Sequence, residues 1–106
     1  MVRVLINLPP RAKRGEIIEI KTLIAHPMET GYRLGGSGGK IPRDIINRFV
    51  CTYNGEEVFR VELFPAIAAN PFIAFSTIAA DSGELAFNWT DDEGQTQTET
   101  RQIIVE

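Results

Sequence analysis

Residues 49–63 read FVCTYNGEEVFRVEL, and this stretch predicts the class of fold. Large apolar side chains alternate with other residues on both sides of Asn54-Gly55, which is the pattern of two half-buried β-strands. Asn and Gly together accept the two positive φ angles of a tight two-residue turn. The stretch therefore predicts a β-hairpin in which Asn54-Gly55 joins two antiparallel strands.

Toward the N-terminus, alternation predicts one strand that ends at Leu8 and another that runs from Glu16 onward. The segment 9–15 between them contains two prolines and a glycine, and we expect a connecting loop there. The residues that share one face of these two strands are Val2, Val4, Ile6 and Leu8, followed by Ile18, Ile20, Thr22 and Ile24.

Toward the C-terminus, the apolar run 72–80, the turn 81–83 and the alternating segment 85–90 predict a second hairpin. A further turn at 91–94 leads into a threonine-rich last strand over 95–105. The chain thus predicts about seven strands and no long amphipathic helix, which favours an all-β fold, an immunoglobulin-like antiparallel β-sandwich. The core aromatics are expected to be Phe49, Phe87 and Trp89.

The composition fits one soluble domain over residues 1–106. A net charge of −3 with scattered Lys and Arg gives no basic patch for nucleic acid or an anionic membrane. No run approaches the roughly 20 apolar residues of a membrane span. The N-terminal apolar run is too short for a signal peptide, so we expect no export signal in the chain itself.

Few residues offer chemistry. The chain has one histidine, His26, and one cysteine, Cys51, whereas metal sites need three or four ligands and a nucleophilic cysteine needs a positioned base. We therefore expect His26 to bond to backbone at a strand end and Cys51 to be a small buried residue. The acidic turn 91–93 lacks the spaced oxygen ligands of a calcium loop and is expected to be solvated. No catalytic residue, metal or cofactor is predicted.

Two loops remain. The segment 35–40, GGSGGK, is unlike a phosphate-binding loop because Ile41-Pro42 follows the lysine and blocks a helix there; a mobile hairpin tip without an assigned role is expected. The residues after it, 41–46, are expected to return the chain to a strand. The proline-bounded segment 64–72 is apolar, and it either packs under the sandwich edge or forms a patch for another protein.

One family resemblance covers nearly the whole chain. The ordered segments HPMETG at 26–31, IPR at 41–43, NG at 54–55, ANPF at 69–72 and FNW at 87–89 resemble the SoxZ family of the bacterial sulfur-oxidation system. The HPMETG block is the most specific of them, because no general rule of folding predicts it. The candidate family-motif or partner-binding residues are His26, Pro27, Met28, Glu29, Thr30, Gly31, Pro42, Arg43, Ile67, Asn70, Pro71 and Phe72.

The resemblance implies a non-catalytic subunit of the SoxYZ carrier complex. Its partner, SoxY, would hold the sulfur substrate on the cysteine of a C-terminal Gly-Gly-Cys-Gly-Gly tail during thiosulfate oxidation. The pair would be periplasmic and exported on the partner's signal, and sulfur-oxidation enzymes would contact it transiently. Apolar residues such as Ile67 and Phe72 and the edge strands are the expected contacts.

Two other classes stay open at this point. A small metal or redox protein would use His26, Met28 and Cys51 as ligands. A generic immunoglobulin-like module for adhesion or carbohydrate binding would expose aromatic residues on one sheet face.

Overall fold

The computed structural model describes residues 3–32, 34–36, 38–39, 41–64 and 69–106. Within these residues the chain forms eight β-strands and no helix. The described residues therefore include no helix that is long and apolar enough to cross a membrane. The strands are β1 (Val4–Asn7), β2 (Arg11–Ala12), β3 (Ile17–Ile24), β4 (Ile46–Tyr53), β5 (Glu56–Glu62), β6 (Phe72–Ile78), β7 (Gly83–Asp91) and β8 (Thr96–Val105).

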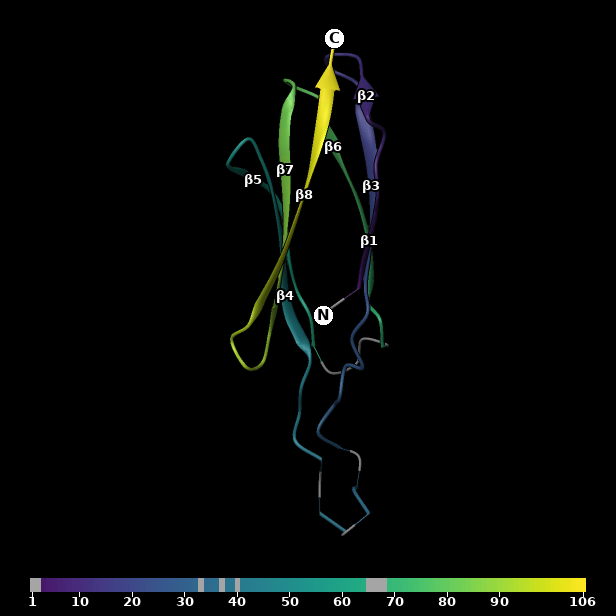
Figure 1. Cartoon of the computed structure of the whole chain (residues 1–106), viewed down its shortest axis with the longest axis vertical. Coiled ribbons are helices and arrows are strands. Elements are labelled where there is room, and N and C mark those ends of the chain that lie inside the picture. The colour runs from purple at the N-terminus through teal and green to yellow at the C-terminus, as the bar shows by residue number, and fades with distance from the viewer. Residues whose placement is uncertain (1–2, 33, 37, 40, 65–68) are drawn as a thin grey trace.

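The strands form two sheets that face each other (Figure 1). The three-stranded sheet has the order β1-β3-β6, and the five-stranded sheet has the order β2-β8-β7-β4-β5. All pairs are antiparallel except β2 with β8. This arrangement confirms the predicted all-β sandwich, with eight strands where the sequence predicted about seven.

The hairpin predicted from residues 49–63 is confirmed. β4 and β5 pair across the turn, in which Asn54 and Gly55 have φ angles of 50° and 84°. The Asn54 side chain also accepts a hydrogen bond from the Glu84 backbone N–H at 2.9 Å, so the turn is tied to β7. The turn therefore fixes the register of the hairpin and the position of the next strand.

The second predicted hairpin is wrong. β6 pairs with β3 and β7 pairs with β4 and β8, so the turn after residue 80 crosses between the sheets. The crossing is held by Arg14, which donates to the Ala80 carbonyl at 3.0 Å, and by Tyr53, whose hydroxyl donates to the Asp81 carbonyl. A local turn signal cannot reveal these distant partners.

The expected loop 9–15 is wrong in part, because Arg11–Ala12 forms β2. This short strand lies beside the end of β8, where the Ile104 N–H donates to the Pro10 carbonyl at 3.0 Å. The two prolines thus mark the place where the chain leaves β1 in one sheet and joins the other sheet. The strand expected to begin near Ile41 begins at Ile46.

The core between the sheets is aromatic, as predicted. Trp89, Phe49 and Phe87 are fully buried, and the Phe49 and Trp89 ring centroids are 5.1 Å apart. The ring of Phe75 in β6 stacks on the ring of Phe59 in β5 with centroids 4.4 Å apart, and this contact joins the two sheets. Such ring pairs add to the burial of large apolar surfaces.

Candidate functional site

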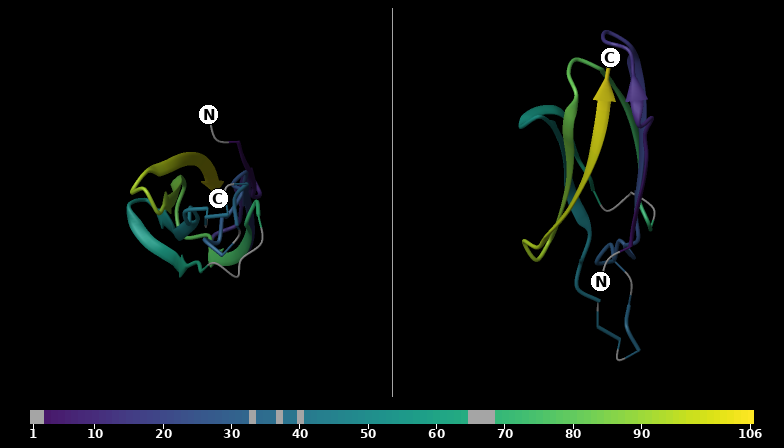
Figure 2. Two further views of the ribbon diagram at one scale, coloured as in Figure 1. Left: turned by 90° about the horizontal axis from the view of Figure 1, so that it is seen from below. Right: turned by 45° about the horizontal axis from the view of Figure 1, so that its top comes forward.

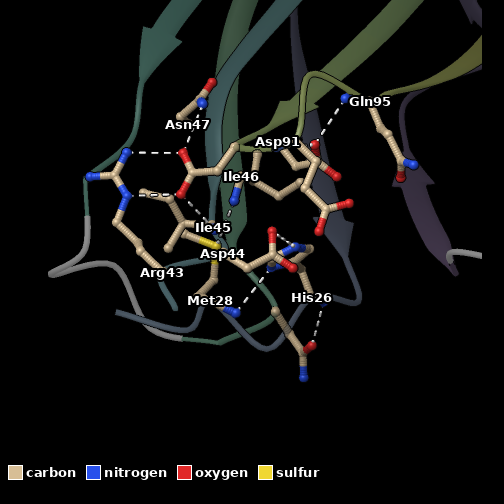
Figure 3. A network of polar contacts seen from close by, with 12 residues as sticks. His26, Met28, Arg43, Asp44, Ile45, Ile46, Asn47, Asp91 and Gln95 are labelled. Atoms are coloured by element: carbon tan, nitrogen blue, oxygen red, sulfur yellow. Dashed lines mark hydrogen bonds and ion pairs between the residues drawn. The ribbon is translucent and has the colours of Figure 1, made fainter. Parts of the chain in front are cut away.

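An arm of the chain, of which residues 30–32, 34–36, 38–39 and 41–43 are described, leaves one end of the sandwich (Figures 1 and 2). Near its end the Gly35 N–H donates to the Gly39 carbonyl at 2.7 Å, which closes a turn. Ser37 and Lys40 of the predicted loop lie outside the described residues. Tyr32 is 74% exposed on the arm. A polar cluster that we call the arm junction lies at its base, and it consists of His26, Met28, Arg43, Asp44, Asn47, Asn70 and Asp92 (Figure 3).

His26 and Asn70 join two motif segments that are far apart in the sequence. The Asn70 side-chain oxygen accepts from the His26 N–H at 2.8 Å, and the Asn70 N–H donates to the His26 carbonyl at 2.7 Å. Asn70 can serve both bonds because it takes a φ of 53°, a conformation that asparagine tolerates better than most residues. The next two residues of the 69–72 segment differ in exposure: Pro71 is buried and Phe72 is exposed.

Met28 is buried and also has a positive φ, 53°. Its N–H donates to Nδ1 of His26 at 3.0 Å, which confirms that His26 bonds to backbone. Its sulfur accepts the N–H of Ile46 at 3.2 Å, at the start of β4. Thioether sulfur is a weak acceptor, and here it satisfies a buried backbone donor. Met28 therefore links the arm to the core.

Arg43 and Asp92 form the strongest polar contact of the arm junction. The guanidinium donates to both carboxylate oxygens, at 2.8 and 2.9 Å. The carboxylate also accepts from the Asn47 side chain at 3.0 Å and from the Ile45 N–H at 3.2 Å. The hydrogen bonds from Arg43, and then those from Asn47 and Ile45, lower the pKa of Asp92 to about 2, against desolvation, which raises it. The contact with Asp92 raises the pKa of Arg43 in turn.

Asp92 corrects the expectation of a solvated acidic turn, because its side chain is only 14% exposed. The one signal for this contact is indirect: Arg43 belongs to a motif, and an arginine in a motif needs a carboxylate or another acceptor. Asp91 closes the turn itself, accepting from the N–H groups of Glu93 and Gln95 at 2.9 Å each.

The two sides of the arm meet closely at its base. Glu29 and Asp44 exchange backbone hydrogen bonds at 2.8 and 2.9 Å. A Cβ on Gly31 would lie 3.0 Å from Cβ of Arg43, and Gly31 has a φ of +87°. Glycine is therefore required there both by the conformation and by the close approach. Nε2 of His26 faces Asp44 Oδ1 at 3.9 Å.

The remaining predicted site residues have simpler positions. Pro27 and Pro42 are exposed, and the Thr30 hydroxyl accepts the Tyr32 N–H at 3.2 Å. Ile67 lies outside the described residues. The arm junction thus brings together four of the twelve motif residues, and its hydrogen bonds tie them to one another and to the core.

Cys51 is fully buried in β4, as predicted. Burial raises the pKa of its thiol to about 12. A neutral thiol that is closed to solvent is a poor nucleophile, because the thiolate is the form that attacks.

The ligand set of the metal alternative does not come together. Met28 contacts Ile46 at the start of β4, whereas Cys51 lies five residues further along the strand, about 16 Å away. The described residues hold no group of three or more His, Cys, Asp or Glu side chains that could bind a metal ion.

The second feature of interest is apolar. The side of the β1-β3-β6 sheet that points away from the core, which we call the outer face, carries Leu5, Leu23 and Phe72 at one end and Ile17 and Ile78 at the other. Between the two apolar ends lie Lys21 and Glu19, which form an ion pair at 3.4 Å. Ile17 is 72% exposed and Phe72 is 60% exposed. Register places Leu5, Leu23 and Phe72 side by side across the three strands, beside a hollow of about 480 Å³. Neighbouring apolar side chains that stay partly in water, such as those at the Leu5, Leu23 and Phe72 end, are a mark of contact surfaces.

Known proteins resemble this chain both in sequence and in fold. The family model described as sulphur oxidation protein SoxZ matches residues 6–102. No match was found among curated protein sequences.

Three solved structures share the fold at low identity. The superoxide reductase (neelaredoxin) from Ignicoccus hospitalis has a TM-score of 0.74 at 18% identity, and the match covers 97% of this chain and 80% of that one. A putative superoxide reductase from Thermotoga maritima has a TM-score of 0.70 at 17% identity, and the match covers 97% of this chain and 85% of that one. The sulfur carrier protein SoxY from Chlorobium limicola f thiosulfatophilum has a TM-score of 0.66 at 13% identity, and the match covers 97% of this chain and 78% of that one.

Proposed function

The chain belongs to the SoxZ family, and we propose that it is the non-catalytic subunit of a two-protein sulfur-carrier complex. It binds and stabilises a SoxY-type partner, which carries the sulfur intermediate of thiosulfate oxidation on the cysteine of a C-terminal Gly-Gly-Cys-Gly-Gly tail. The complex works in the periplasm, to which both chains are exported together. Sulfur-oxidation enzymes bind the pair transiently.

The state of Cys51 is the observation that carries this proposal. A sulfur carrier needs an accessible thiolate, because the thiolate is the form that attacks and exchanges sulfur. Cys51 is the chain's one cysteine, and its thiol is fully buried with a pKa of about 12. A sulfur-oxidation protein of this kind therefore acts through a thiol that another chain supplies.

The outer face supports the same proposal. Ile17, Phe72 and their neighbours leave apolar area in water that a permanent partner would cover, and permanent interfaces are richer in apolar contacts than transient ones. The polar arm junction lies at the Phe72 end of this surface, because Asn70 pairs with His26 two residues before Phe72. A partner on the outer face would thus reach the base of the arm.

Co-expression tests the proposal. The chain, with an affinity tag, is produced together with a SoxY-type protein that ends in Gly-Gly-Cys-Gly-Gly, and the eluate is analysed by size-exclusion chromatography with light scattering. A stable one-to-one complex is expected. Elution of the two proteins as separate species at micromolar concentration would contradict it.

Replacement of Cys51 by serine separates a structural thiol from a carrier thiol. We expect Cys51→Ser to leave thiosulfate-dependent turnover by the reconstituted system unchanged, with a stability loss of about 1 kcal/mol because a hydroxyl is buried in its place. Turnover is measured beside a urea unfolding curve. Lost turnover in a variant that folds and binds its partner would assign the sulfur to this chain.

A further inference from the structure

The edges of the two sheets are protected unequally. An open edge strand presents unpaired backbone groups to other chains, and proteins protect such edges with charge, proline, inward-pointing charged residues or short length. β1 has four residues and β2 has two. β5 carries a charge at four of its seven positions, namely Glu56, Glu57, Arg60 and Glu62. Each of these edges has one of the known protections.

β8 is open over most of its length, because β2 covers only Ile104 and Val105. Its half-buried Glu99 and Arg101 lie on the same face as the buried Ile103, so they point toward the sandwich interior. Arg101 also donates to the Thr100 carbonyl at 2.7 Å, which occupies an edge acceptor. This edge too is protected.

β6 is the exception among the described strands. Its sequence is FIAFSTI, with no charge and no proline over seven residues. It pairs with β3 on one side and stands at the end of its sheet. A strand of this length and composition at an open edge is the kind that adds another strand.

Register identifies which backbone groups of β6 are free. The Ile24 N–H donates to the Pro71 carbonyl and the Ala79 N–H donates to the Glu16 carbonyl, so odd-numbered residues point toward β3. The even-numbered residues point to the open side, because neighbours in a strand alternate. They are Phe72, Ala74, Ser76 and Ile78, and within the described part of the chain no hydrogen bond reaches their backbone groups.

The same even-numbered residues carry their side chains on the outer face. Phe72 and Ile78 are 60% and 59% exposed at the two ends of the strand, and Ala74 and Ser76 are exposed between them. One added strand beside β6 would therefore pair the free backbone groups. It would also extend the apolar surface at the two ends of β6, where Leu23 lies beside Phe72 and Ile17 lies beside Ile78. Between these ends, Ala74 and Ser76 lie beside the ion-paired Lys21 and Glu19.

We propose that β6 is the docking edge for the SoxY-type partner, which adds a strand to it and extends the β1-β3-β6 sheet across the interface. This inference rests on the proposed function for the identity of the partner. The solved SoxY structure has the same fold, with a TM-score of 0.66, so a SoxY-type protein has a strand equivalent to β6 to offer. The pairing strand is uncharged at the positions facing Phe72 and Ile78, since a charge there would be buried against apolar side chains.

Amide hydrogen exchange measured by NMR on the isolated chain and on the complex tests the pairing directly. In the isolated chain the amides of Ala74, Ser76 and Ile78 exchange quickly, and those of Phe75 and Thr77 are protected by β3. In the complex the three even-numbered amides gain protection, by at least about 100-fold. An unchanged alternating pattern in a complex that has formed would overturn the docking edge and leave the proposed function intact.

Two variants and a matched control complete the test by titration calorimetry with the partner. Ala74→Pro removes a donor on the open side only, and Ser76→Lys adds an edge charge; each is expected to weaken binding by about 100-fold. Glu62→Pro makes the same change on β5, where the Leu63 N–H bonds to Asn47 and the Glu62 N–H faces outward, and it is expected to bind normally.

The outcomes are distinct. If the unaltered chain does not bind a SoxY-type protein, the proposed function fails. If it binds and both β6 variants bind like Glu62→Pro, the docking edge is wrong. If the unaltered chain alone is a dimer that Ala74→Pro dissociates, while partner binding is unaffected, the occupant of this edge is a second copy and the proposal is overturned.

Discussion

The arm junction and the outer face differ in how far each is satisfied within the chain. In the arm junction, Asp92 accepts four hydrogen bonds and the Met28 sulfur satisfies a buried N–H. On the outer face, Phe72 and Ile17 keep most of their apolar area in water. We infer from the difference that the motif residues of the arm junction hold the shape of the molecule, whereas the proposed partner binding depends on the outer face, which among the described motif residues carries Phe72.

The largest expected effect is on partner binding. If this effect is absent, the proposed division between a structural arm junction and a binding outer face is wrong. Phe72→Asp places a charge on the outer face and should weaken binding of a SoxY-type partner by roughly 100-fold, with an unchanged melting temperature, because the side chain is already exposed. Ile104→Asp, at an exposed apolar position of β8, is the control and should bind normally. Equal affinities of the two variants would contradict the assignment of the outer face.

The reverse pattern is expected in the arm junction. Asp92→Asn breaks the paired contact with Arg43 and should lower the free energy of unfolding by about 2 kcal/mol, the loss typical of charged hydrogen bonds at a largely buried group. Urea unfolding measures it. Asp81→Asn, whose pair with Arg14 is exposed on both sides, should cost less than about 0.5 kcal/mol. A loss of unfolding free energy in Asp92→Asn that is as small as the loss in Asp81→Asn would show that Asp92 does not stabilise the arm junction.

The difference in unfolding free energy between the unaltered chain and Asp92→Asn should depend on pH, and this dependence tests the role of Asp92 further. The folded-state pKa of Asp92, about 2, lies below its ordinary value of 3.8. Its contribution is therefore complete above about pH 4 and is lost as the pH falls through 2. Unfolding curves of the unaltered chain and of Asp92→Asn should converge across this window. A difference that stays constant down to pH 2 would place the source of the stability elsewhere.

Met28→Leu has the smallest expected effect. Leucine fills a similar volume but offers no acceptor, so the buried Ile46 N–H loses its partner and the free energy of unfolding should fall by about 1 kcal/mol. Chemical denaturation measures this, with partner binding unchanged. A loss of binding at full stability would mean that a partner contacts Met28, contrary to the division between the two regions.

The sequence predicted the parts of the molecule that depend on neighbouring residues. The Asn54-Gly55 hairpin, the buried Cys51 and the aromatic core are confirmed, because strand alternation and turn conformation are local properties. The second hairpin was wrong, because a turn signal does not say whether the next strand stays in the same sheet. β2 was missed, since pairing with the end of β8 overrides the two prolines before it.

Within the arm junction, the motif residues were identified but their contacts were not. The bond between His26 and Asn70 joins segments 44 residues apart, and no spacing rule predicts it. Asp92 was assigned to solvent because its neighbours Asp91 and Glu93 suggest an ordinary acidic turn. Its role depends on Arg43, which three-dimensional packing brings to it.

The most direct test of the account is the location of the sulfur. The complex is loaded from thiosulfate by the sulfur-oxidation enzymes, and the intact mass of each chain is measured under non-reducing conditions. We expect a sulfur-containing mass increase on the SoxY-type partner and an unchanged mass for this chain. A sulfur adduct on Cys51, in a chain that remains folded, would contradict the account.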